Sequence, residues 1–518
     1  MSVNRLIFVG LSGGMSVLIS FIPTCKSSTE EVSNITEGER LARIRCASCH
    51  LFPEPALLSQ SAWENGVLPQ MAYYFGLITK NRTPYKNISI EEYQNLKQSG
   101  VFPDEPSISK EEWAAIRDYY LSNAPEQPAL IDHKISAPAA LNLFTPQPIH
   151  LRLKEGPLTT MVHFDSQGQN IYISDLRDTL YKVDINGKVQ SKTKLLSLIS
   201  DMSVREDNTQ YLLAMGNIHP KDNPLGHFLY RDISGNISSI MEGLHRPVDI
   251  ERGDLNQDGL EDLVICTYGH TVGHFSWYEQ TGTHQFEEHR LSDLPGAIKS
   301  YIHDFNDDQL PDIITLMGQG DEGIFIYYNK GNNQFEVENV LRFHPLFGSS
   351  FFDLVDYEED GDLDILLANG DNADYSAIPK KFHGIRLFLN NGQNKFEEAF
   401  FYPMYGATKA LLRDFDKDGD KDIAAIAYFP EYRIAPEEGF IFLDNTNADD
   451  FKFSAATFEN ATLGRWLNLE AADIDRDGDD DLLLGSLYYA PTPSPAPLQN
   501  AWISNGPNAL ILENQTIK

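Results

Sequence analysis

The chain has 518 residues, of which 42% are hydrophobic and 11% aromatic, so it carries enough core material to exclude global disorder. Acidic side chains outnumber basic ones by 75 to 41, a formal net charge of -34. Such a surface repels phosphates, which excludes nucleic acid as a partner. It suits hard divalent cations, which prefer oxygen ligands. The four cysteines are too few for a disulfide framework and must be interpreted one at a time.

Residues 1–24 have the pattern of a signal peptide. Arg5 is the only charged side chain before an apolar run over residues 6–22, which is too interrupted to predict a membrane span. The run ends in Ile22-Pro23-Thr24-Cys25, which resembles a bacterial lipobox. The resemblance implies lipidation of Cys25, a tether over residues 25–36, and a place on the periplasmic side or outer-membrane surface of the cell envelope. An ordinary signal peptide with an incidental cysteine is the alternative.

Cys46-Ala47-Ser48-Cys49-His50 matches C-x-x-C-H, the attachment motif of c-type haem. Two thiols three residues apart can each reach one vinyl group of the same porphyrin, and the histidine can then ligate the iron. A redox dithiol or half of a zinc site would use the same two cysteines. Zinc is disfavoured because no second cysteine pair follows, and a thioredoxin-like dithiol because no βαβ pattern surrounds the motif. We predict one haem c, bound through Cys46, Cys49 and His50.

The flanks of the motif favour haem. Residues 37–46 predict a helix with Gly38 near its start, where another helix could approach closely. Ser109 and Glu112 form a capping-box pattern, and aromatic residues then recur at helical spacing up to Pro125. A Gly-bearing first helix crossed by an aromatic last helix resembles the class I cytochrome c fold. The resemblance covers residues 37–126 and implies a small all-α domain with a haem.

Met71 is the only methionine between His50 and Pro125. A thioether ligand there would give His/Met ligation, which resembles electron-transfer cytochromes and raises the reduction potential. Alternatively Met71 is a core residue, and the iron is five-coordinate or bound by His133. Since Met71 is the only candidate inside residues 37–126, we predict it as the sixth ligand.

Five nine-residue acidic loops repeat through the rest of the chain. Their first residues are Asp254, Asp304, Asp356, Asp414 and Asp473. The starts are separated by 50, 52, 58 and 59 residues, and each loop leads into an apolar run. A period near 50 residues made of short strands indicates propeller blades or a solenoid. Two leading units, near residues 171–173 and 211–213, lack the loop. Residues 139–518 therefore predict an all-β, seven-bladed propeller, after a linker over residues 127–138.

These repeats look like the FG-GAP (VCBS) family of propeller repeats. In each loop, carboxylate or amide oxygens at positions 1, 3, 5 and 9 and a carbonyl at position 7 can surround one Ca²⁺. The position-7 carbonyl of the first loop belongs to Leu260. The predicted side-chain ligands are Asp254, Asn256, Asp258, Asp262, Asp304, Asn306, Asp308, Asp312, Asp356, Glu358, Asp360, Asp364, Asp414, Asp416, Asp418, Asp422, Asp473, Asp475, Asp477 and Asp481.

Two loops depart from the pattern. Gln309 replaces the turn glycine of the second loop, where a left-handed conformation is expected, and Glu358 is longer than the usual Asp in the third. We expect weaker sites there. An Asx-rich turn that keeps its charges in water is the alternative for every loop.

Other residues are ambiguous. His270, His274 and His303 are expected to be structural rather than a catalytic cluster, and Cys266 a buried strand residue. No Walker loop or H-E-x-x-H motif occurs.

Three functions compete. The favoured one is a membrane-anchored cytochrome that passes electrons to a redox protein partner, with a calcium-stabilised propeller as docking or substrate-binding platform. The second is a propeller dehydrogenase, for which a quinone cofactor is an alternative without any sequence fingerprint. The third is an adhesion propeller for a carbohydrate or protein ligand. One haem carries one electron while dehydrogenation releases two, which favours the electron carrier.

Overall fold

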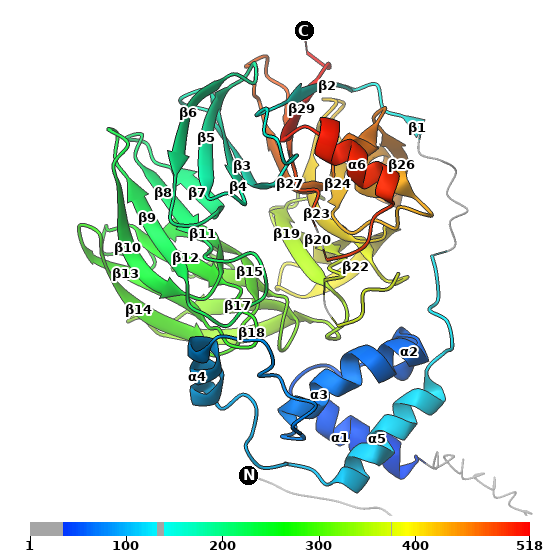
Figure 1. The fold of residues 1–518 in the computed structure, drawn as a ribbon. Coiled ribbons are helices and arrows are strands. Elements are labelled where there is room, and N and C mark those ends of the chain that lie inside the picture. The colour runs from blue at the N-terminus through cyan, green and yellow to red at the C-terminus, as the bar shows by residue number, and fades with distance from the viewer. Residues whose placement is uncertain (1–34, 132–138, 374, 490, 518) are drawn as a thin grey trace, which may run out of the picture. The chain divides into compact units, whose positions relative to one another are not determined.

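The computed structural model describes residues 35–131, 139–373, 375–489 and 491–517 (Figure 1). Residues 37–518 form one compact unit. The predicted signal peptide, Cys25, His133, most of the tether and part of the linker lie outside the described residues. Within the described ranges, no helix is long and apolar enough to cross a membrane.

Helices occupy the N-terminal part of this unit. They are α1 (Glu37–Cys46), η1 (Pro55–Leu57), α2 (Gln60–Ala62), η2 (Trp63–Val67), α3 (Leu68–Tyr74), α4 (Ile90–Ser99) and α5 (Lys110–Asn123). The two helices expected from the sequence, α1 and α5, are both present, and Ser109 and Glu112 form the predicted capping box. We call residues 37–123 the helical module.

The glycine near the start of α1 is needed for helix packing. A Cβ built on Gly38 would lie 2.3 Å from the carbonyl oxygen of Ala115 on α5. Any side chain at this position would therefore push α5 away. The predicted close approach of the first and last helices is confirmed.

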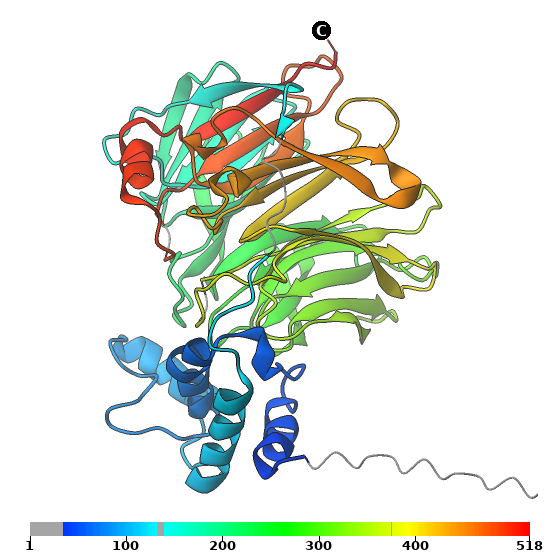
Figure 2. The same ribbon diagram turned by 90° about the vertical axis from the view of Figure 1, so that its right-hand side faces the viewer.

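The described residues from 139 onward form seven four-stranded antiparallel blades, the sixth extended by β1 (Figures 1 and 2). Blade 1 is β3 (Thr159–Asp165), β4 (Asn170–Asp175), β5 (Thr179–Asp184) and β6 (Val189–Lys194). Blade 2 is β7 (Ile199–Val204), β8 (Gln210–Ala214), β9 (Gly226–Arg231) and β10 (Ile237–Leu244). Blade 3 is β11 (Pro247–Gly253), β12 (Asp262–Thr267), β13 (Phe275–Gly282) and β14 (Gln285–Ser292). Blade 4 is β15 (Ala297–His303), β16 (Asp312–Met317), β17 (Gly323–Asn329) and β18 (Phe335–Arg342).

The remaining blades contain longer connections. Blade 5 is β19 (Ser349–Val355), β20 (Asp364–Asn369), β21 (Gly384–Asn390) and β22 (Phe396–Pro403). Blade 6 is β23 (Ala407–Arg413), β24 (Asp422–Ala427), β25 (Phe440–Asn447) and β26 (Lys452–Thr457), with β1 (Ala139–Ala140) parallel to its edge. Blade 7 is β27 (Trp466–Ala472), β28 (Asp481–Ser486), β29 (Ala509–Asn514) and β2 (Phe144–Ile149). Short helices η3 (Pro436–Gly439), η4 (Ala448–Asp450), η5 (Ala461–Leu463) and α6 (Ala496–Asn505) lie in the connections.

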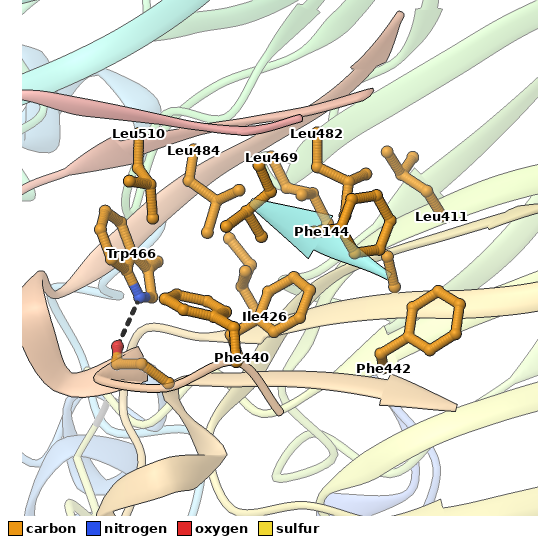
Figure 3. Close-up of a cluster of buried hydrophobic side chains, with 14 of the residues drawn as sticks. Phe144, Leu411, Ile426, Phe440, Phe442, Trp466, Leu469, Leu482, Leu484 and Leu510 are labelled. Carbon is orange, nitrogen blue, oxygen red and sulfur yellow. Dashed lines mark hydrogen bonds between the residues drawn. The ribbon is translucent and has the colours of Figure 1, made fainter. Parts of the chain in front are cut away.

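Blade 7 closes the ring by joining both ends of the propeller. Its outer strand β2 pairs antiparallel with β29, from Phe144 opposite Asn514 to Ile149 opposite Ala509. The apolar core between blades 6 and 7 is shown in Figure 3, where the buried Trp466 donates its indole N–H to the carbonyl of Ala461 at 2.8 Å. This pairing ties the first strand of the propeller region to the last by backbone hydrogen bonds, so the ring is held closed.

A repeated irregularity shapes the seven inner strands. The pairing register shifts after the first residue of β3, β7, β11, β15, β19, β23 and β27. Hydroxyl groups at the displaced position reach the neighbouring blade: Thr160 donates to the carbonyl of Ile199 at 3.0 Å, and Ser200 to that of Pro247 at 2.6 Å. The bulges thus turn side chains toward the next blade and help to hold the ring together.

Glu438 makes the stability of blade 6 depend on pH. The side chain is buried, and burial raises its pKa to about 8 from 4.5. Folded protein therefore keeps this proton up to about pH 8, while the unfolded chain loses it near pH 4.5. The free energy of unfolding should fall as pH rises through this window. We expect Glu438→Gln to recover up to about 5 kcal/mol of unfolding free energy at the alkaline end of this window, measured by urea unfolding at both ends. Glu437→Gln, at the exposed neighbour, should not.

Candidate functional site

The C-x-x-C-H motif lies where α1 ends. Cys46 is the last residue of the helix, and a turn carries the chain to His50. The hydroxyl of Ser48 donates to the carbonyl of Arg45 at 2.7 Å, which satisfies one of the free carbonyls at the helix end. Both thiols are unbridged. Cys46, Cys49 and His50 all line one cavity of about 1570 Å³.

The protonation states of this turn fit haem attachment better than thiol redox chemistry. Burial raises the pKa of the Cys46 thiol to about 11, whereas redox-active cysteines have a lowered pKa. Burial also lowers the pKa of His50, which favours the neutral imidazole that a metal ligand requires. His50 Nδ1 lies 3.0 Å from the carbonyl oxygen of Leu51. Donation from Nδ1 would leave Nε2 as the ligand atom.

Met71 reaches the same cavity from α3. Although it lies 21 residues after His50 in the sequence, the helical module brings both residues to the same cavity. The surrounding wall is mostly apolar and aromatic, and includes Trp63, Val67, Leu68, Phe75, Trp113 and Tyr120. The predicted thiols, histidine and methionine with this lining fit the requirements of a haem.

The cavity continues beyond the helical module. Its other lining residues include Asp201, Lys299, Lys409 and Glu470 from the inner strands of the propeller. The module and the propeller are joined by specific contacts: Glu92 on α4 accepts a hydrogen bond from the backbone N–H of Asp222 at 3.2 Å. The predicted haem pocket and the central channel of the propeller are therefore one continuous space.

Two of the acidic loops bring three carboxylates together. In Asp414–Asp416–Asp418 and in Asp473–Asp475–Asp477, one oxygen of each side chain lies within 4.8 Å of the others. The Oδ1 atoms of Asp414 and Asp473 are also buried without a hydrogen-bond partner in the described part of the chain. A cation would supply the missing partner and neutralise the repulsion.

The other three loops are closed by their own amides. Asp254 accepts from the backbone N–H groups of Asp258 and Gly259 at 3.0 and 2.9 Å, and Asp304 and Asp356 do the same in their loops. Gln309 has a φ of +70°, so the left-handed conformation expected at this position is confirmed.

The position-9 aspartates have a structural role that the sequence did not indicate. Asp262, the first residue of β12, accepts the backbone N–H groups of Leu255 at 2.9 Å and Gln280 at 2.8 Å. Asp312, Asp364 and Asp481 each accept the equivalent pair, and Asp422 accepts the amide of Asn445. These residues link each loop to the third strand of its blade. A carboxylate oxygen has a second lone pair, so calcium ligation by them stays a prediction.

Three further acidic residues, absent from the sequence prediction, lie near the loops. Glu279, Asp444 and Glu513 each precede the third-strand residue that is bound by the position-9 aspartate. Asn256 donates to Glu279 at 3.1 Å. Burial and the Asp418 carboxylate raise the pKa of Asp444.

These acids occur only beside the first, fourth and fifth loops. The equivalent third-strand positions beside the second and third loops hold Tyr328 and Leu389. The same three loops carry both the turn glycine and Asp or Asn at position 3. The third-strand acid therefore separates the three stronger candidate calcium loops from the two weaker ones.

The predicted histidines do not form a cluster. His274 pairs with Glu288 at 2.9 Å, His303 packs against Phe305, and His270 lines the cavity. Cys266 is fully buried on β12, as predicted.

Comparison with known proteins identifies the repeats. Residues 304–367 and 356–425 match the FG-GAP-like repeat family. The chain thus carries FG-GAP repeats within a seven-bladed propeller. No curated protein sequence matches it.

Solved structures match the chain at low identity and low TM-score. The BBS1N structure in complex with ARL6DN is 9% identical, covering 73% of this chain and 99% of that one, with a TM-score of 0.44. The Dos1 propeller is 10% identical, covering 68% and 77%, with a TM-score of 0.41. The Neurospora crassa Pan2 WD40 domain is 10% identical, covering 68% and 95%, with a TM-score of 0.40.

Proposed function

We propose that the protein is a c-type cytochrome with one haem that transfers electrons at a bacterial cell envelope, to which lipidated Cys25 anchors it. One observation carries the proposal: Cys46, Cys49, His50 and Met71 line the same cavity, although Met71 is remote from the motif in sequence. A bound haem would supply one-electron redox chemistry. The FG-GAP propeller would serve as the docking platform for a redox protein partner.

The chain's own residues have distinct tasks in this proposal. Cys46 and Cys49 would hold the porphyrin covalently, and His50 and Met71 would ligate the iron. The hydrogen bond between His50 and Leu51 fixes the orientation of the imidazole. The aromatic wall, with Trp63 and Tyr120 buried at its base, would exclude water and raise the reduction potential.

A reduced-minus-oxidised absorption spectrum of the purified full-length chain tests the proposal. We expect a c-type band that survives denaturation and organic extraction, because the group is covalently attached. A chain matured in a host competent for cytochrome c assembly that shows no such band would contradict the proposal.

Met71→Ala should lower the reduction potential. Loss of the thioether removes the ligand that stabilises ferrous iron, so the midpoint should shift to more negative values in a spectroelectrochemical titration. The weak long-wavelength band of methionine-ligated ferric haem should disappear as well. Met215→Ala is the matched control, because Met215 lines the propeller side of the same cavity. An unchanged potential in Met71→Ala would assign the sixth ligand elsewhere.

A dehydrogenase is the second candidate, favoured by the cavity itself. Its volume of about 1570 Å³ exceeds the range of about 300–1000 Å³ typical of a single small-molecule site. Two-electron oxidation would require a second redox centre, such as a quinone. An organic cofactor in the purified chain, identified by mass spectrometry of its denatured extract, would favour this candidate over the electron carrier.

A further inference from the structure

The third residue of each inner strand belongs to one ring around the propeller channel. All seven of these residues line the cavity, and they are Met161, Asp201, Asp249, Lys299, Phe351, Lys409 and Asn468. The repeated register shift sets them at equivalent positions, immediately after the bulge. Four of the seven are charged, so the ring contains a concentration of charge in the interior of the protein.

The acidic members of the ring are bound to protein groups. Asp201 accepts the backbone N–H of Ile250 at 3.0 Å, and Asp249 accepts that of Ser300 at 2.9 Å. Lys299 is paired with Asp249 at 2.8 Å and with Glu251 at 2.6 Å. These residues join neighbouring blades, and the positive charge of Lys299 compensates the negative charges of its two carboxylate partners.

The carboxylates of the next layer are also engaged. Glu470 accepts the backbone N–H of Phe164 and lies 3.4 Å from His163, a contact that joins blades 7 and 1. Asp353 accepts from the hydroxyl of Tyr301 and pairs with Arg413, each at 3.1 Å.

Lys409 differs from the other cations of the cavity. Its ammonium has no hydrogen bond or ion pair with any residue in the described ranges, and its contact is with the ring face of Phe351, 4.4 Å from the centroid. Arg413 is paired with Asp353, and Arg246 donates to three backbone carbonyls. The side chain of Lys409 is half-buried, and burial lowers its pKa. Withdrawing an ammonium from water without a hydrogen-bonding or ionic partner is costly.

We infer that Lys409 binds the carboxylate of a small organic acid in the propeller channel. An ammonium has three donors, and a ligand carboxylate would supply the acceptor that the protein lacks. Phe351 would pack against the organic part of the ligand, which an inorganic anion lacks. The cavity has room for such a molecule in addition to a haem.

The inference goes beyond the proposed function and does not need a haem. If organic acids bind to a chain that lacks haem, the proposed function is contradicted and this inference stands. If haem is present and no acid binds, the proposed function stands and this inference is contradicted. In a haem-bearing chain, the bound acid would occupy the same cavity as Cys46, Cys49 and His50.

Calorimetric titration of the full-length chain tests the inference. The probes are acetate, pyruvate, gluconate and benzoate at constant ionic strength, with chloride and sulfate as inorganic probes. We expect at least one carboxylate to bind, and Lys409→Met to weaken its affinity at least tenfold. Lys188→Met is the matched control, because Lys188 is exposed in the turn between β5 and β6 and should leave the affinity unchanged.

Any of three results would overturn the inference: no carboxylate binds, inorganic anions alone bind, or Lys409→Met binds as tightly as the wild-type chain. A second measurement needs no variant. An amine-acylating reagent should modify Lys409 more slowly in the presence of the bound carboxylate, as measured by peptide mass spectrometry. Equal modification with and without the carboxylate would also contradict the inference, even if Lys409→Met failed to fold.

Discussion

Replacing both Cys46 and Cys49 with alanine is expected to abolish covalent haem. Each thiol would form one thioether to the porphyrin, so a chain without either cannot retain the group after denaturation. The measurement is haem staining after denaturing electrophoresis, together with the mass of the intact chain. Wild-type protein should carry the mass of one haem, and the double variant none.

Cys266→Ala provides the matched control. Cys266 is the third cysteine among the described residues and is buried in blade 3, beside the hydroxyl of Ser300. This variant should retain the full haem content. Each single variant, at Cys46 or at Cys49, should retain less haem than wild type, because only one of the two thioethers remains. A double variant that keeps its haem through denaturation would contradict covalent attachment by this motif.

The helical module shows how much local sequence can establish. The capping residues Ser109 and Glu112 define the start of α5, and Gly38 marks the close approach of α1 to Ala115. Both signals act within one or two turns of helix, so the sequence carries them directly. The position of Met71 on the cavity wall depends on how α3 packs. From the sequence, Met71 could be proposed as a ligand only because no other methionine was available.

The propeller shows where local sequence reasoning stops. The five acidic loops recur every 50 to 59 residues. This interval fits about seven times into residues 139–518, which is enough to predict seven blades, two of them without the loop. The third-strand acids Glu279, Asp444 and Glu513 lie 17, 22 and 32 residues beyond the last residue of their loops. This separation is outside any local pattern, and only the strand register brings the acids near the loops. Lys409 was missed for the same reason, since its environment comes from several blades.

Calcium should stabilise the propeller mainly through the first, fourth and fifth loops. A ligand that binds only the folded state adds about 2.7 kcal/mol when its concentration is 100 times Kd. Chelation should therefore lower the melting temperature of the full-length chain by several degrees. Asp418→Ala should reproduce part of this loss in calcium, because Asp418 is one of the three clustered carboxylates of the fourth loop.

Asp308→Ala is the matched control. Asp308 occupies the same position 5 in the second loop, where Gln309 replaces the glycine and Tyr328 replaces the third-strand acid. Its loss should lower the melting temperature in calcium by less than Asp418→Ala does. Asp444→Asn tests the third-strand acid directly and should weaken calcium binding at the fourth loop, while Leu389 offers no equivalent ligand beside the third.

Chelator distinguishes a metal effect from a folding defect. Without calcium, the carboxylates of the fourth loop repel one another, and burial together with Asp418 raises the pKa of the neighbouring Asp420. Removing one of these charges should then cost little or even stabilise the chain, since it relieves like-charge repulsion. The difference in melting temperature between wild type and Asp418→Ala should therefore shrink or change sign in chelator. An equal loss with and without calcium would show that Asp418 stabilises the loop by hydrogen bonding alone, and the loop would then be an Asx-rich turn.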